Sequence, residues 1–440
     1  MTGVALIIAF VLAIIVMIVA ISKFKVHPFL AIMAVSLILA MLAGIPFVDT
    51  VKPDGTKVSG IPTVIGAGFS GTFSSIGIVI ILGALIGSVL EKTGAALKLA
   101  DMVIKVVGKK RPELAIELMG WVVSIPVFCD SGFVILNPIR KALVKRTAVS
   151  SVAMTVALSA GLYISHVFIP PTPGPIAAAN TLGVGDNLLL VMGLGVVCSI
   201  FPLIAGLVYA KFIGKRVKSA DEVTDNGEVT KTYEELVAEY GKLPNGFNAL
   251  APILVPIILM ALGSISSMAG WTGALDIACQ FLGKPIIALA VGTIFAVIQL
   301  ATAHKMSDFY NITNETLKTV GPILFVTAAG GVLGKVISSS SMVAFITQHA
   351  EVLSAVGIFF PFLLAAILKT AQGSSTVAIT TTAGIIAPLL GALGLASPVK
   401  TVLCVMAIGA GAMTVSHAND SYFWVRSEEH TSELQSHLNL

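Results

Sequence analysis

Long apolar runs, separated by short polar or charged segments, make up most of the chain. Runs close to the roughly 20 residues that a membrane-spanning helix needs lie at residues 4–21, 27–44, 74–90, 149–168, 187–211, 249–268, 285–303, 320–337 and 399–415. Two further apolar stretches, at about 112–139 and 354–392, are interrupted by glycine, proline or polar residues. The pattern predicts an all-α polytopic membrane protein in which two broken hairpins lie among unbroken helices.

The first broken hairpin places one carboxylate, Asp130, among apolar residues and close to Pro126 and Pro138. Irregular backbone at membrane depth persists only where protein or a water-filled cavity satisfies its polar groups. An ionisable residue there is a functional candidate by default, so Asp130 and its neighbours Ser131 and Gly132 are predicted to bind substrate or the coupling ion. The alternative is structural, because an aspartate at a helix start caps free backbone N–H groups.

The second broken hairpin contains a glycine followed by three hydroxyl side chains, Gly373, Ser374, Ser375 and Thr376. Hydroxyl groups and the free N–H groups of a half-helix start suit the carboxylate of a hydroxylated acid. These four residues are therefore predicted to bind substrate. The alternative is that the hydroxyls bond back to the carbonyls of their own helix.

Two further segments cannot continue the helices that precede them. Soon after His166 come prolines at positions 170, 171, 173 and 175, with Thr172 among them, and each proline removes a backbone donor. The corresponding segment late in the chain contains His417, Asn419 and Asp420. Thr172, Asn419 and Asp420 are candidate binding residues. His166 and His417 are candidate proton carriers, with packing roles as the alternative.

The two halves of the chain repeat several features in the same order. The pairs Gly83/Gly87 and Ser165/His166 recur as Gly330/Gly334 and Ser416/His417 at a nearly constant offset. We interpret residues 1–218 and 249–425 as two transmembrane repeats joined by a cytoplasmic linker at 219–248. An odd number of spans between their starts would invert the second copy, which predicts an inverted-repeat secondary transporter with two opposed re-entrant hairpins. Residues 426–440 look like the in-frame translation of a sequencing-library adapter and are predicted to be an artefact tail.

Basic residues determine the predicted orientation, because short cytoplasmic loops are enriched in lysine and arginine. Lys23 and Lys25 place the first loop inside, so the N-terminus is predicted outside. Basic clusters at 105–111 and 140–146 bracket the first hairpin, whereas residues 338–353 contain no lysine or arginine. The first hairpin is therefore predicted to enter and leave from the cytoplasm, and the second from outside.

The composition agrees with a membrane protein and limits its partners. Hydrophobic residues make up 56% of the chain and charged residues 11%, against about a quarter charged in a soluble domain. Cytoplasmic basic loops explain the net charge of +4, so no nucleic-acid partner is predicted. The four cysteines lack metal-site spacing, and the sequence has no G-x-x-x-x-G-K-[ST] loop for ATP. We expect no metal or cofactor beyond a coupling ion, which is taken as H⁺. The expected partners are a small carboxylate substrate and the lipid bilayer, and a homo-oligomer is possible.

Two motif matches point to other functions. Gly66, Gly68 and Gly71 have the spacing of a nucleotide-binding turn, but no strand precedes them, so a flexible stretch before the third span is predicted instead. Gly183-Val-Gly-Asp186 has the form used by intramembrane aspartyl proteases, which would need Asp130 as the second carboxylate. An intramembrane aspartyl hydrolase is thus a remote alternative; more simply, Asp186 caps the span that starts at residue 187.

Four motifs in order, Phe128–Val134, Phe168–Pro175, Gly373–Ala378 and Ser416–Asp420, together resemble the gluconate permease family of proton symporters. The resemblance runs from the N-terminus to about Val425. It implies a carrier, not an enzyme, that takes up gluconate or a related small hydroxy acid with protons across the bacterial inner membrane. D-serine and D-glycerate are alternative substrates within the same family. Asp130 and Thr172 stand where several members carry a glutamate and a histidine, and members continue past the Asn-Asp motif into a further membrane segment.

Overall fold

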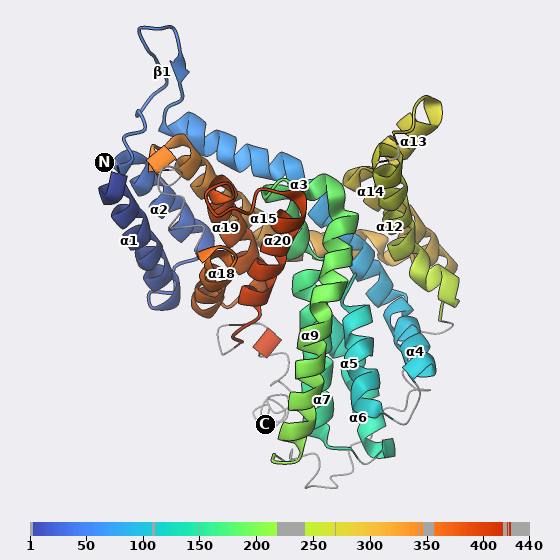
Figure 1. The fold of residues 1–440 in the computed structure, drawn as a ribbon. Coiled ribbons are helices and arrows are strands. Elements are labelled where there is room, and N and C mark those ends of the chain that lie inside the picture. The colour runs from blue at the N-terminus through green and yellow to red at the C-terminus, as the bar shows by residue number, and fades with distance from the viewer. Residues whose placement is uncertain are drawn as a thin grey trace. The chain divides into compact units, whose positions relative to one another are not determined.

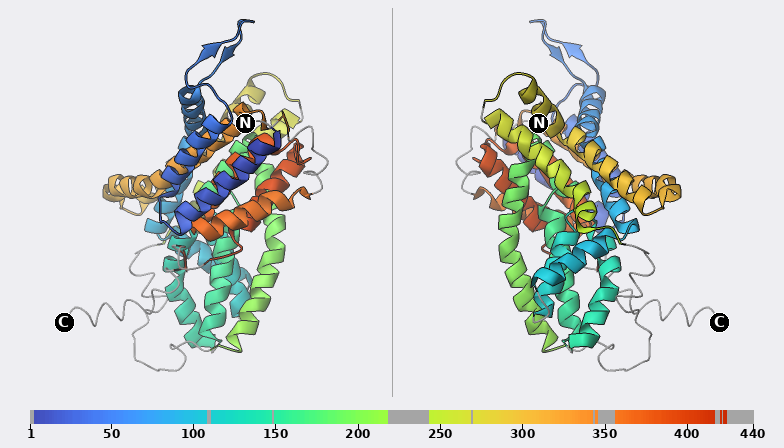
Figure 2. Two further views of the ribbon diagram at one scale, coloured as in Figure 1. Left: turned by 90° about the vertical axis from the view of Figure 1, so that its left-hand side faces the viewer. Right: turned by 90° about the vertical axis from the view of Figure 1, so that its right-hand side faces the viewer.

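The computed structural model describes residues 3–107, 111–147, 149–217, 243–268, 270–342, 344–345, 356–416, 420 and 422–423. Within these ranges the strands are β1 (Thr50–Val51) and β2 (Lys57–Val58), a short antiparallel hairpin that precedes α3 (Figures 1 and 2). Seven of the described helical segments are long and apolar enough to cross a membrane. The prediction of an all-α polytopic membrane protein is confirmed.

The helices follow the predicted apolar runs. The first half contains α1 (Gly3–Ser22), α2 (Pro28–Leu42), α3 (Ile61–Lys92), α4 (Ala95–Val107), α5 (Pro112–Val123), α6 (Cys129–Thr147), α7 (Ser151–Phe168), α8 (Pro173–Thr181), η1 (Gly185–Asn187) and α9 (Leu188–Gly214). The second half contains α12 (Gly246–Met268), α13 (Ala274–Gly283), α14 (Pro285–Thr302), η2 (Met306–Asp308), α15 (Phe309–Ser339), α18 (Phe359–Gln372), α19 (Ser375–Ile386), η3 (Ala387–Leu389) and α20 (Pro398–Ala412). The helices α4, α8 and α13 are additional to the prediction, because their 13, 9 and 10 residues are too few for a span.

The third helix is longer than the predicted run at 74–90, because α3 begins at Ile61. Asp49 holds this start: its carboxylate accepts hydrogen bonds from Gly60 N at 2.6 Å and Thr63 Oγ1 at 3.0 Å, which lower the pKa of the carboxyl. The prediction of a flexible stretch at 66–71 is wrong, since these residues are helical. A Cβ at Gly68 would lie 2.7 Å from Val332 Cα of α15, so this glycine permits close helix packing.

Both predicted hairpin breaks are present. Helices α5 and α6 flank residues 124–128, and α18 and α19 flank Gly373 and Ser374. In the first break Ser124 Oγ donates to Val127 O at 3.0 Å. In the second, Gly373 has φ +82°, a left-handed conformation that glycine adopts without a steric cost. That each hairpin enters and leaves by one membrane face stays a prediction.

The chain forms two compact units, and each combines segments from both halves of the sequence. Unit 1 contains Met1–Ile80, Pro173–Val191 and Lys318–Asp420; unit 2 contains Ile81–Thr172, Met192–Leu317 and Ser421–Leu440. Within unit 2 α5 packs on α7 with α6 alongside (Figure 1), and within unit 1 α18 packs on α20 with α19 alongside. Each broken hairpin therefore packs on the helix that follows it. The division into two repeats stays a prediction, and residues 218–242 of the linker lie outside the described part of the chain.

Glycines allow the main pair of packed helices in each unit to approach each other closely. In unit 2, a Cβ at Gly161 of α7 would collide with the carbonyl oxygen of Glu117 on α5. In unit 1, a Cβ at Gly411 of α20 would collide with the carbonyl oxygen of Phe362 on α18. The helices of each pair therefore touch backbone to backbone, as small residues allow in membranes.

We expect Gly161→Ala to destabilise the protein by about 1–3 kcal/mol, the usual cost of overpacking, because the new Cβ has no space beside α5. Gly193→Ala on α9 is the matched control, since nothing lies within 4 Å of its Cβ position. Alanine favours a helix over glycine by up to about 1 kcal/mol, so the control should keep or raise the Tm. Thermal unfolding in detergent should therefore separate the two variants, and equal Tm changes would contradict the close contact of α5 with α7.

One basic residue of the cluster at 140–146 is internal. Arg140 is fully buried; its Nε donates to Asn137 Oδ1 at 2.6 Å and its Nη1 to Ser151 Oγ at 2.7 Å. These bonds tie α6 to the start of α7. Arg140 therefore does not indicate which side of the membrane is cytoplasmic. The predicted orientation depends on the other basic residues of the two clusters.

Candidate functional site

The start of α6 carries the predicted carboxylate. Asp130 is half-buried in the first turn of α6, where the helix dipole favours a negative charge, and Ser131 follows in the same turn. A Cβ at Gly132 would lie 2.6 Å from Leu162 Cδ2 of α7, so the missing side chain lets α6 approach α7. Asp130 is thus placed for either binding or capping, whereas Gly132 has a packing role.

Two aromatic rings lie near His166, which is buried near the end of α7. The imidazole stacks on Tyr163 with ring centroids 6.5 Å apart, and lies 6.2 Å from the ring of Phe128 in the first break. Phe128 immediately precedes α6. The predicted proton carrier His166 and the start of α6 therefore belong to one local region of unit 2.

A residue from the end of the chain packs into this region. The ring of Tyr422, which is buried, stacks on Tyr163 at 5.2 Å between centroids and meets Phe133 of α6 edge-on at 6.3 Å. Its hydroxyl donates to the carbonyl oxygen of Ser159 on α7 at 3.1 Å. Tyr422 therefore packs against both α6 of the first hairpin and α7.

The proline-rich segment after α7 leads into α8, which contacts the second hairpin. Where α7 ends, Thr172 Oγ1 donates to Ile169 O at 2.7 Å. Helix α8 then packs on α19 and α20, and a Cβ at Gly174 would lie 2.9 Å from Ile379 Cδ1 and 3.7 Å from Thr376 Cα. Tyr422, which follows the fourth motif, therefore packs on the first motif in unit 2, and the second motif packs on the third in unit 1.

The second hairpin presents the start of α19. Gly373 N donates to Lys369 O at 2.9 Å and ends α18. Ser374 caps α19, its Oγ accepting a hydrogen bond from Val377 N at 3.3 Å. Ser375 and Thr376 are buried in the first turn, where N–H groups and the helix dipole favour an anion. Ser374 therefore has a capping role, and the next two residues lie where a substrate carboxylate would be stabilised.

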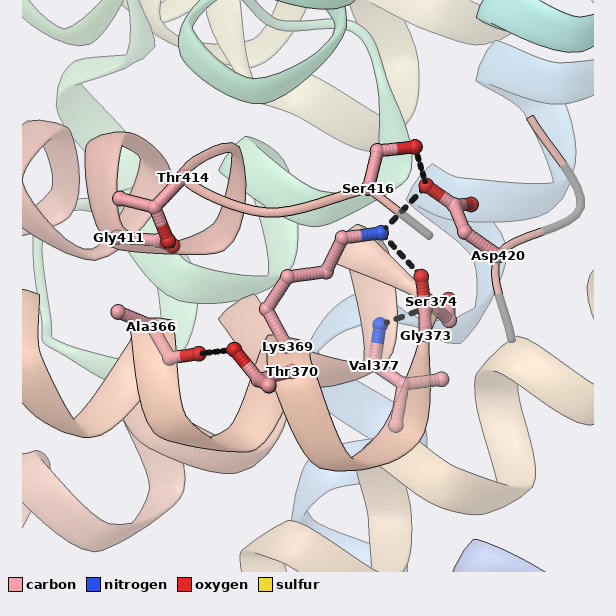
Figure 3. A network of polar contacts seen from close by, with 10 residues as sticks. All are labelled: Ala366, Lys369, Thr370, Gly373, Ser374, Val377, Gly411, Thr414, Ser416 and Asp420. Atoms are coloured by element: carbon pink, nitrogen blue, oxygen red, sulfur yellow. Dashed lines mark hydrogen bonds and ion pairs between the residues drawn. The ribbon is translucent and has the colours of Figure 1, made fainter. Parts of the chain in front are cut away.

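Figure 3 shows a buried ion pair beside this helix start. Lys369 Nζ lies 2.7 Å from Asp420 Oδ2 and also donates to Gly373 O. Ser416 Oγ donates to the same carboxylate oxygen at 2.6 Å. The side chains of Lys369 and Asp420 are 0% and 4% exposed. The predicted binding residue Asp420 is thus held by a cation at the break of the second hairpin.

Lys369 and Glu117 are the two candidates that the sequence analysis misses. A lysine within an apolar run carries the same signal as Asp130, because charges inside a membrane are functional candidates by default. Glu117 of α5 is fully buried, and neither of its carboxylate oxygens has a hydrogen-bond partner among the described residues. The predicted site residues His417 and Asn419 lie outside the described ranges.

Comparison with known proteins agrees with a transporter. The sequence profile described as GntP family permease matches residues 5–436. An uncharacterized permease of Haemophilus influenzae is 36% identical over 429 residues, which are 95% of this chain and 84% of that protein. A gluconate permease of Pseudomonas aeruginosa is 29% identical over 413 residues, covering 93% of this chain and 87% of its own. Among solved structures, MtrF of Neisseria gonorrhoeae, presented as one of a class of antimetabolite efflux pumps, covers 93% of this chain and 89% of its own with a TM-score of 0.61; at 17% identity the likeness concerns the fold.

Proposed function

Because this chain belongs to the GntP family of permeases, we propose that it carries gluconate or a related small hydroxy acid, together with protons, across the bacterial inner membrane. The observation that carries the proposal is the start of α19, where the buried residues Ser375 and Thr376 closely follow Gly373, whose carbonyl oxygen accepts a hydrogen bond from the Lys369 ammonium. A helix start and a cation suit a carboxylate, and hydroxyl side chains suit the hydroxyls of the substrate.

The candidate residues divide into three roles. Ser375, Thr376 and Lys369 are proposed to bind the substrate carboxylate. Asp130, in unit 2, is a separate candidate that is proposed to bind either the coupling proton or substrate hydroxyls, because a carboxylate can take up a proton and offers two acceptor oxygens. The remaining four residues have structural roles: Gly132 allows α6 to pack on α7, Thr172 bonds within the turn after α7, and Gly373 and Ser374 form the second break.

Proteoliposomes containing the purified protein test the proposal. Labelled gluconate is expected to show counterflow and to accumulate when an inward proton gradient is imposed, in competition with unlabelled gluconate. Stronger competition by D-serine or D-glycerate would assign one of these alternative substrates. A passive anion channel would equilibrate the label without accumulation, and an intramembrane hydrolase would instead cleave a reporter helix in a manner dependent on Asp130 and Asp186. Either of the last two outcomes would refute the proposed function.

We also propose that the N-terminus and the loop between α2 and α3 face the outside. In a cysteine-free background, Ser59→Cys, at an exposed position, should react with an impermeant thiol reagent added to intact cells. Ser340→Cys should react in the same way if the second hairpin is inverted, whereas Asp225→Cys in the linker should react only after the cells are opened. Equal labelling of all three in intact cells would contradict the inverted arrangement.

A further inference from the structure

Glu117 lies where three helices of unit 2 meet. Its own helix α5 packs on α7, and the unit 2 part of α9 runs alongside (Figure 1). A Cβ at Gly206 of α9 would lie 2.7 Å from Glu117 Oε1 and 2.9 Å from Ala160 Cβ of α7. The carboxyl group therefore faces an alanine and a glycine, and the missing side chain of Gly206 leaves room for it.

The surroundings of this carboxyl group do not suit a negative charge. Glu117 is 0% exposed, and both of its carboxylate oxygens lack a hydrogen-bond partner among the described residues. An ionised carboxylate without a partner is very costly in such a place, whereas a neutral carboxyl group costs far less. Glu117 therefore carries a proton in this packing.

Two hydrogen-bond donors near Glu117 are likewise buried without a partner among the described residues. The indole Nε1 of Trp121 lies one turn later on the same face of α5. The hydroxyl of Ser159 belongs to the residue before Ala160 on α7. A buried donor without a partner is costly, so three polar groups in one region await a further hydrogen-bond partner.

The charged groups of the adjoining helices have other partners where their contacts are described. On α4, Asp101 pairs with Lys98 at 3.6 Å and with Lys105 at 2.8 Å. On α6, Arg140 donates to Asn137 and Ser151. The other described titratable groups on α5, α6, α7 and α9 are Glu113, Cys129, Asp130, Lys141, Tyr163, His166, Cys198, Tyr209 and Lys211. The side chains of Lys145 and Arg146 lie outside the described part of α6.

Helix α9 provides a way to expose the carboxyl group to water. Pro202, one turn before Gly206, removes a backbone donor within α9, and such a position permits a bend. On other sides of α9, Phe201 and Val208 are 78% and 63% exposed, so α9 is an outer helix. A carrier can couple a proton to its substrate only if its states differ in their affinity for the proton. Movement of α9 would create this difference at Glu117.

We propose that Glu117 is a proton-binding site, which keeps its proton while α9 packs on α5 and α7 and releases it to water when α9 moves away. On release the O–H bond breaks, its electron pair stays on the carboxylate, and the proton passes to a water molecule. Trp121 Nε1 and Ser159 Oγ can then donate hydrogen bonds to the carboxylate or to the water beside it. The inference rests on the proposed function and names a group that takes up the coupling proton.

The first test detects the proton directly and does not depend on transport. The infrared spectrum of the wild type at neutral pH should contain the carbonyl band of a protonated carboxylic acid, and Glu117→Gln should lack this band. Glu113→Gln is the matched control, because Glu113 lies one turn earlier on α5 and is only half-buried; it should keep the band. The wild-type band in Glu117→Gln would overturn the proposal.

A second measurement keeps this test decisive if Glu117→Gln does not fold. In wild-type protein containing ¹³C-labelled glutamate, the shifted band of the protonated acid should weaken as the pH is raised. A labelled band that is absent, or that stays constant over the whole pH range in which the protein remains folded, would overturn the proposal.

The last test measures coupling in proteoliposomes. Glu117→Gln resembles the protonated state in shape and charge, so it should fold and keep gluconate counterflow. Because an amide cannot release a proton in this way, gluconate accumulation driven by an inward pH gradient should fall to the level seen without the gradient. Glu113→Gln should accumulate gluconate like the wild type.

Two outcomes of this transport test would overturn the proposal. Accumulation at the wild-type level in Glu117→Gln would show that transport does not use the proton on Glu117. Loss of counterflow together with accumulation in a folded Glu117→Gln would assign Glu117 to substrate binding or packing. Absence of gluconate counterflow in the wild type would instead refute the proposed function, and the infrared result would still decide whether Glu117 binds a proton.

Discussion

Lys369→Gln is expected to lower the free energy of unfolding by about 3–5 kcal/mol, the usual cost of removing one partner of a buried ion pair. The substitution leaves the carboxylate of Asp420, 4% exposed, facing a neutral amide. It also removes the ammonium that donates to Gly373 O at the end of α18. The measurement is thermal or denaturant unfolding in detergent, together with the yield of monodisperse protein.

Lys400→Gln is the matched control, because this lysine belongs to the adjacent α20 but is exposed, with its Nζ 3.3 Å from Gly394 O. Its effect should stay within about 0.5 kcal/mol, as for most surface substitutions. The double variant Lys369→Gln/Asp420→Asn should recover most of the lost stability, since replacing both partners of a buried pair is often neutral. If Lys369→Gln unfolds no more easily than the control, the ion pair is not the buried contact described here.

Removing one partner of the Lys369–Asp420 pair is costly, but replacing both partners by neutral residues should be nearly neutral. Stability alone therefore does not explain the presence of the pair, which suggests a functional role. Buried ion pairs are weak evidence for stability, because the cost of removing both charges from water offsets their attraction. The position of this pair at the Gly373 break, beside the hydroxyl-rich start of α19, gives such a reason.

The sequence predicted the local features of the fold well, because they depend on short-range chemistry. Gly373 and Pro126 mark breaks that the structure contains, since glycine adopts a left-handed conformation and proline lacks a backbone donor. The start of α3 was misplaced for a related reason. The glycines at 66, 68 and 71 read as flexible, whereas Gly68 serves a close contact with α15 that only the tertiary structure reveals.

The long-range features could not be predicted from one sequence. Tyr422 packs on Tyr163 and Phe133, and Gly174 packs beside Thr376, across large separations in the chain. No periodicity encodes which distant segments meet. Arg140 illustrates the same limit. An arginine near the end of a hairpin is predicted to face the cytoplasm, and only the structure shows that it is buried and bonded to Ser151.

Lys369 is different, because its signal was present in the sequence. The rule that directs attention to Asp130 applies equally to a lysine inside an apolar run. What the sequence lacked was the partner: Asp420 was predicted as a binding residue for another reason, and the distance of 2.7 Å between the two charges comes from the fold. The candidate site therefore changes from isolated polar residues to a charge pair beside a helix start.

The remaining question concerns Asp130, for which capping and binding are both compatible with its place in the first turn of α6. Asn is as good a helix cap as Asp, and the loss of the charge–dipole term costs only about 0.3–1 kcal/mol. Asp130→Asn should therefore fold nearly as well as the wild type. Any larger loss of transport then reports on function and not on the structure of α6.

We expect Asp130→Asn to raise the half-saturation concentration for gluconate about tenfold, because a hydrogen bond to a charged group contributes about 1.5–3 kcal/mol and the amide replaces part of it. Counterflow and pH-driven uptake should fall together. Asp186→Asn is the matched control, since this aspartate is exposed and outside the proposed site; it should transport normally. Intact exchange with lost accumulation in Asp130→Asn would make Asp130 the group that takes up the coupling proton, and unchanged transport would leave Asp130 with its capping role alone.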